Sequence, residues 1–106
     1  MPLTREFKET VVELARDREF RVQLLREAVE SYLMEADVAT GNLLIRDYLN
    51  ATQSFDEVAV DLKLQVSSLR RMLSEQGNAR SRNMFGVIHA CLKREGLDSL
   101  QALLAA

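Results

Sequence analysis

Apolar residues recur every three or four positions along almost the whole of this 106-residue chain. That spacing places them on one face of an α-helix, and no run alternates polar and apolar residues for long enough to form a strand. Hydrophobic residues make up 47% of the chain and charged residues 28%, which is typical of a soluble globular protein. The sequence therefore predicts a single all-α domain over 1–106, built as a small helical bundle.

The first half of the chain, residues 1–50, predicts three helices. A short one follows Thr4, a second follows Asp17 and a third begins near Asp37. The carboxylate of Asp17 can accept hydrogen bonds from the free N–H groups of a helix start. The residues expected to face inward are Phe7, Val11 and Leu14 in the first helix, Phe20, Leu24, Leu25, Ala28, Tyr32 and Leu33 in the second, and Leu44, Ile45, Tyr48 and Leu49 in the third.

Residues 54–73, SFDEVAVDLKLQVSSLRRML, contain one break in the apolar pattern. Ser54 and Glu57 form an S-x-x-E capping box, in which both side chains satisfy free N–H groups at a helix start. An inner apolar face follows, and its spacing restarts at Val66. We therefore expect two short helices that cross closely at the small residue Ala59, because a larger side chain would hold them apart. Further helices are expected over 81–106.

Charge is spread unevenly along a chain whose net charge is −2. Residues 1–49 carry ten acids against seven bases, whereas the segment from Lys63 to Arg94 carries seven bases against Glu75 alone. A charge run is usually a solvated face, but a basic segment on a helical motif is also a feature of nucleic-acid-binding proteins. Charge alone leaves both interpretations open.

The 54–73 stretch resembles the helix-turn-helix of phage-repressor type (Xre/Cro-like) regulators. With Phe55 as the first of twenty positions, apolar residues occupy positions that such motifs use for their core. They are Val58, Ala59, Leu62, Leu64, Leu69 and Met72, at positions 4, 5, 8, 10, 15 and 18. The ninth position, usually glycine because the turn often needs a positive φ, is Lys63. Gln65 is a weaker helix cap than the usual serine or threonine.

The resemblance extends over nearly the whole chain. The segments MPLTREFKETV, LLIRDYLNAT, SLRRML followed by GN, and RNMFGVIHACLKREG together resemble addiction-module antidote proteins, which are similar to HigA-type antitoxins. This resemblance implies a homodimer that binds double-stranded operator DNA upstream of its own operon and represses it. It also implies a second partner, a small basic toxin of the RelE/ParE/HigB class, although some relatives look like solitary regulators.

If the second helix of this stretch reads DNA, its outward side chains suit base edges. Arginine can donate two hydrogen bonds to guanine, glutamine can do the same with adenine, and valine can contact a thymine methyl group. The expected base-reading residues are Gln65, Val66, Ser67, Arg70 and Arg71. Phosphate contacts, which fix register without reading sequence, are expected from Lys63, Asn78, Arg80, Arg82 and Asn83. A helix starting near Ser81 would add free N–H groups.

Other residues that suggest chemistry are expected to be structural. His89 has no ligand-type side chain at helical spacing, and Cys91 shares an apolar face with Ile88. A single cysteine excludes an internal disulfide, and no signal-peptide or transmembrane run is present, so we expect a cytoplasmic protein. No phosphate loop, paired carboxylate site or Ser/His/Asp arrangement can be identified, so we expect no enzyme, cofactor or metal.

Two further expectations concern partners. The alternative function is a protein-interaction module, with a partner on the acidic N-terminal half and no specific DNA binding. The tail GLDSLQALLAA places Leu97, Leu100, Leu103 and Leu104 on one side of a short helix. We expect this stripe to be covered partly by the protein's own core and partly by a second subunit.

Overall fold

The computed structural model describes residues 10, 12–74, 77 and 79–106. These residues form a compact all-α globule, and no strand occurs among them. The helices are α2 (Arg18–Leu33), α3 (Val38–Ala51), α4 (Phe55–Asp61), α5 (Val66–Met72), α6 (Ser81–Arg94) and α7 (Leu100–Ala105). Helical residues at 10 and 12–14 precede α2. None of these helices is both long and apolar enough to cross a membrane.

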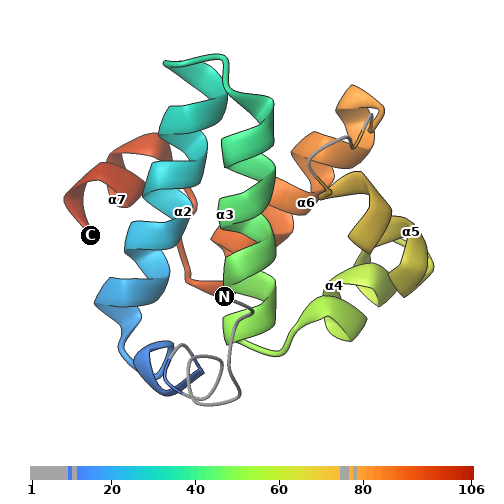
Figure 1. Cartoon of the computed structure of the whole chain (residues 1–106). Helices are drawn as coiled ribbons and strands as arrows, with labels where there is room; N and C mark the ends of the chain where they lie inside the picture. The colour runs from blue at the N-terminus through green and yellow to red at the C-terminus, as the bar shows by residue number, and fades with distance from the viewer. Residues whose placement is uncertain (1–9, 11, 75–76, 78) are drawn as a thin grey trace, which may run out of the picture.

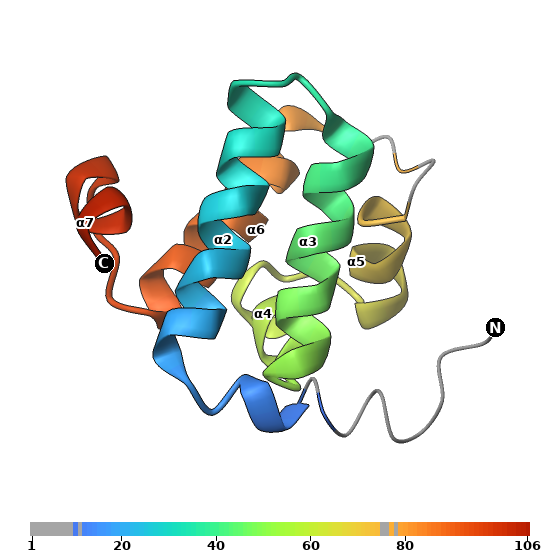
Figure 2. The same cartoon turned by 60° about the vertical axis from the view of Figure 1, so that its left-hand side comes forward.

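Helices α2 and α3 pack side by side along their length (Figures 1 and 2). Their predicted starts are confirmed, because Asp17 accepts a hydrogen bond from the Glu19 N–H at 3.0 Å and Asp37 accepts one from Thr40 at 3.0 Å. Gly41 allows the close contact between the two helices, since a Cβ there would lie 2.5 Å from the Tyr32 ring.

Three helices end in the same backbone turn, in which the second residue after the helix adopts a left-handed conformation. At these positions Gln53, Lys63 and Gly96 have φ angles of 54°, 57° and 72°. After α4, the N–H of Leu64 bonds to the carbonyl of Ala59 at 2.9 Å and that of Lys63 bonds to Val60 at 3.1 Å. This is the Schellman motif, which satisfies carbonyls that the helix end leaves free.

The core collects the buried faces of all the helices in the described part of the chain. It contains Val22, Leu25, Ala28, Ile45, Tyr48, Leu49, Phe55, Val58, Ala59, Leu69, Leu73, Val87, Ala90, Cys91, Leu97 and Leu103. Two residues expected inside are exposed, since Leu33 is 66% exposed at the end of α2 and Leu14 is 47% exposed. Phe7 and Val11 lie outside the described residues.

The predicted capping box does not form, although α4 begins where expected, at Phe55. Ser54 makes no cap hydrogen bond, because its hydroxyl is buried against Thr52, with 2.6 Å between the two oxygens. The carboxylate of Glu57 instead binds Arg94 of α6 at 2.5 Å. The two side chains therefore serve contacts between elements rather than the helix start.

The tail divides its leucines between two environments. Leu97 and Leu103 are buried in the core, while Leu100 and Leu104 are 65% and 64% exposed. Helix α7 packs against α2, where the Arg26 guanidinium donates to the carbonyl of Leu103 at 3.3 Å. The expectation that the protein's own core covers part of the stripe is confirmed.

Candidate nucleic-acid interface

Helices α4 and α5 are two seven-residue helices joined by residues 62–65. Lys63 adopts a left-handed backbone conformation in this connection, and its side chain is exposed. Ala59 is buried to 1% exposure and Leu69 is fully buried, so the two helices share the core beneath the connection. Ala59 is therefore buried, as its place on the inner face of α4 predicts.

Helix α5 has a buried face and a solvent face. Leu69, together with Leu73 just beyond the helix, is fully buried, whereas Ser67, Arg70 and Arg71 are exposed. Gln65 precedes the helix and is also exposed. Four of the five predicted base-reading residues therefore point outward from one short segment.

Val66 is the exception, because it is half-buried and packs against the core. It lies three residues before Leu69 and seven before Leu73, which places it on the inner face of the helix. The prediction that Val66 points outward is wrong in this respect.

The two arginines of α5 differ in their surroundings. The Arg70 guanidinium carbon lies 4.1 Å from the centre of the Phe55 ring at the start of α4. This is a cation–π contact, and it restricts where the guanidinium can reach. Arg71 has no side-chain partner in the part of the chain that the structure describes, so its guanidinium is available to a ligand.

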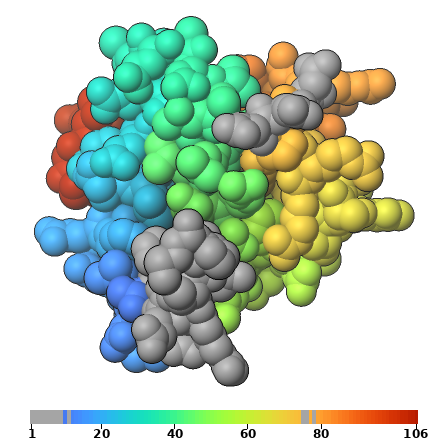
Figure 3. Space-filling model, in the orientation of Figure 1, coloured from blue at the N-terminus to red at the C-terminus, as the bar shows by residue number. Residues whose placement is uncertain are grey.

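The predicted phosphate contacts lie on the connection and at the start of α6. Arg80 precedes α6 and is exposed, as is Arg82, whereas Asn83 is half-buried. Asn78 lies outside the described residues. In the space-filling view, α5 and the start of α6 together form the right-hand edge of the molecule (Figure 3).

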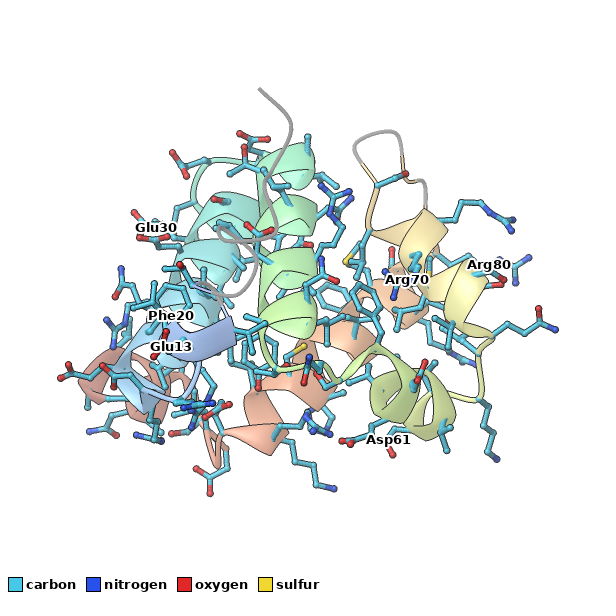
Figure 4. All side chains as sticks on the ribbon, turned by 60° about the horizontal axis from the view of Figure 1, so that its bottom comes forward. Glu13, Phe20, Glu30, Asp61, Arg70 and Arg80 are labelled. Carbon is cyan, nitrogen blue, oxygen red and sulfur yellow. The ribbon has the colours of Figure 1, made fainter. Side chains whose placement is uncertain are left out.

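Acidic side chains are separated from this edge. Asp56, Glu57 and Asp61 occupy the exposed face of α4, and Asp61 points away from Arg70 and Arg80 (Figure 4). Glu57 also pairs with Arg94, which lies in the basic segment of the sequence. The carboxylate of Asp61 therefore lies away from Arg70 and Arg80, whereas that of Glu57 is paired with a base of α6.

Sequence reasoning missed Asn42, a polar residue on α3 that is fully buried. Its side-chain amide donates to the carbonyls of Met72 and Ser74, at the end of α5, with distances of 3.4 and 3.2 Å. A signal was present in the sequence, because Asn42 falls on the same helical stripe as Ile45 and Leu49.

Residues that could suggest other chemistry are not assembled into a site. No group of three or more His, Cys, Asp or Glu that could hold a metal occurs among the described residues. Cys91 is buried as predicted, and burial raises the pKa of its thiol to about 12. The thiol therefore stays protonated and unreactive at neutral pH.

No protein-family model matches this chain, and no curated protein or solved structure does either.

Proposed function

We propose that this protein is a sequence-specific DNA-binding regulator in which α4, residues 62–65 and α5 act as a helix-turn-helix. The observation that carries the proposal is the solvent face of α5, which presents Arg70 and Arg71 with no acidic residue on the helix. A helix of this kind fits the major groove, where side chains can contact base edges.

In this proposal the exposed residues divide into two roles. Arg71, Gln65 and Ser67 contact base edges, and Arg71, whose guanidinium has no partner among the described residues, is suited to a bidentate contact with guanine. Lys63, in the connection before α5, and Arg80 and Arg82, at the start of α6, contact phosphates and fix the register of the helix on the duplex. The acidic faces of α4 and α2 point away, so they do not repel the DNA backbone.

The broader proposal is that the protein acts as a homodimer that represses its own operon and neutralises a small basic toxin. One feature of the structure favours a protein partner. Leu33, Met34 and Val38 are 66%, 80% and 50% exposed around the turn between α2 and α3, where Glu30 and Glu35 are also exposed. An apolar surface bordered by carboxylates suits a basic protein, which also supports the alternative of an interaction module.

The test is to select duplexes from a random double-stranded library and measure binding of the winners against salt. A DNA-binding protein enriches a sequence, and its log affinity falls linearly with log salt, with a slope of about −0.9 per phosphate neutralised. If no sequence is enriched and wild-type protein shows no salt-dependent binding, the DNA proposal fails and the interaction module takes its place.

A further inference from the structure

Asn42 joins three helices through one side chain. It projects from α3, its Oδ1 accepts a hydrogen bond from the Tyr32 hydroxyl of α2 at 2.7 Å, and its Nδ2 donates to the end of α5. The side chain of Asn42 is fully buried, although its three partners are only half-buried. A buried amide is costly unless its partners are in place, and these partners are supplied by all three elements.

At the C-terminal end of α5 the N–H and hydroxyl of Ser74 both donate to the carbonyl of Arg71, and Asn42 adds bonds from another helix. Helix α5 has only seven residues, and Gln65 provides no side-chain cap at its start. Short helices are marginal in isolation, and their last carbonyls lack partners within the helix. The Nδ2 group of Asn42 bonds to two carbonyls in this region, those of Met72 and Ser74. This amide therefore attaches the end of α5 to the α2–α3 pair.

The Tyr32 hydroxyl and the two carbonyls at the end of α5 together fix which way the amide faces, because the carbonyls can only accept from its NH₂ group. Because the hydroxyl donates to Oδ1, the NH₂ group is turned toward α5. Tyr32 is itself held, since its ring packs directly on the backbone of Gly41. The chain of contacts therefore runs from Tyr32 through Asn42 to the carbonyls at the end of α5.

We propose that Asn42 is a positioning residue for the DNA-reading helix and that Tyr32 orients it. The inference rests on the proposed function of α5. Arg71 immediately precedes Met72, whose carbonyl Asn42 binds, so loosening this end of the helix displaces Arg71 first. A bidentate arginine contact depends on geometry, and a binding site that is about 1 Å too loose loses much of its selectivity.

The variant Tyr32→Phe tests whether Tyr32 orients Asn42, and Tyr48→Phe serves as its control. Tyr48 also donates one hydrogen bond of 2.7 Å from its hydroxyl, but to Glu95 at the end of α6. Tyr48→Phe therefore removes a tyrosine hydrogen bond of the same length whose acceptor, a carboxylate, lies at the end of α6 and not of α5. Both variants are measured for amide hydrogen exchange at residues 69–72, and for affinity to a library-selected duplex and to a random duplex of equal length.

We expect Tyr32→Phe to speed exchange at 69–72 relative to α2, and Tyr48→Phe to leave that ratio unchanged. On the selected duplex Tyr32→Phe should lose about five- to tenfold in affinity, the effect of one weakened hydrogen bond, with random-duplex binding unchanged. Asn42→Ala should do the same more strongly. Changing the salt concentration should restore neither the exchange ratio nor the affinity for the selected duplex in these variants.

Equal effects of the two tyrosine variants on α5 exchange would overturn the positioning of α5 by Asn42. Faster exchange with an unchanged ratio of selected to random affinity would overturn its role in recognition. If the wild-type protein does not bind DNA, the proposed function of α5 fails instead. This outcome can be told apart from the two above because the exchange measurement needs no DNA.

Discussion

Lys63 adopts at the end of α4 a backbone conformation that favours glycine. Its φ of 57° places Cβ close to the following carbonyl oxygen, and no hydrogen bond of its side chain offsets this among the described residues. The same turn after α6 uses Gly96, where no such conflict arises. A lysine at this position therefore costs folding stability, as does Gln53 in the same turn after α3.

Lys63→Gly is expected to stabilise the protein by about 0.5–1 kcal/mol. The left-handed backbone costs an L-residue roughly 1–2 kcal/mol, and glycine offsets part of that gain through a more flexible unfolded chain. Urea unfolding checks the stability. The same variant should reduce the salt slope of DNA binding by about one unit on every duplex, as for loss of a phosphate contact. A destabilised Lys63→Gly protein would mean that the lysine side chain supports the turn.

Arg71→Ala tests base reading at a residue that the fold does not need. The side chain is exposed and unpartnered in the described structure, so the melting temperature should stay unchanged. Affinity for the selected duplex should fall by about 1–3 kcal/mol, with discrimination lost at one base position. Binding titrations on single-base variants of the duplex measure this. Equal losses on selected and random DNA would instead make Arg71 a phosphate contact.

At the scale of elements, the crossing of α4 and α5 depends on Ala59. Ala59→Leu should destabilise the protein by roughly 1–3 kcal/mol, because the added side chain overpacks a position that is 1% exposed. Val60→Leu is the control, since the neighbouring Val60 is 75% exposed and should change stability by no more than about 0.5 kcal/mol. Denaturant midpoints of the two variants compare them directly. Similar midpoints would contradict the tight packing of the crossing.

Helix starts and inner faces could be predicted from the sequence because they depend on neighbouring residues. Asp17 and Asp37 cap helices through bonds to residues two and three positions away. Contacts between elements could not be predicted in this way. Ser54 and Glu57 match a local capping pattern, yet the carboxylate of Glu57 pairs with distant Arg94 of α6, and the Ser54 hydroxyl pairs with Thr52 instead of a helix N–H. The same holds for the candidate site. The exposed arginines of α5 were predicted because they follow from local helical spacing, whereas the attachment of α5 through Asn42 of α3 was not.

At the scale of the whole molecule, the dimensions bear on how DNA can be read. The protein measures 35 × 32 × 28 Å and carries one proposed reading helix on one edge. Successive major grooves on one side of a duplex are about 34 Å apart. A single protomer therefore presents one α5 to one groove, and reading two half-sites requires a second copy.

A groove of about 800 Å³ between α2, α6 and α7 provides a candidate surface for that copy. Its lining is mostly apolar, and Leu33, Phe85 and Leu100 at its border are more than 60% exposed. A two-fold interface uses the same patch on both subunits. The patch must therefore carry both a groove and the protruding side chains that fill the groove of the other subunit. The lining also includes Lys93 and Asp98, whose opposite charges can pair across such an axis.

We therefore expect a homodimer in solution that is broken by charges on the exposed part of the tail. Leu100→Glu combined with Leu104→Glu changes two leucines that are 65% and 64% exposed and leaves buried Leu97 and Leu103 in place, so the fold should persist. Val60→Glu, on the exposed face of α4, is the matched control and should remain dimeric. Light scattering at micromolar concentration measures the mass of each protein. A double variant that stays dimeric would exclude α7 from the main interface, and a monomeric wild-type protein would exclude the dimer itself.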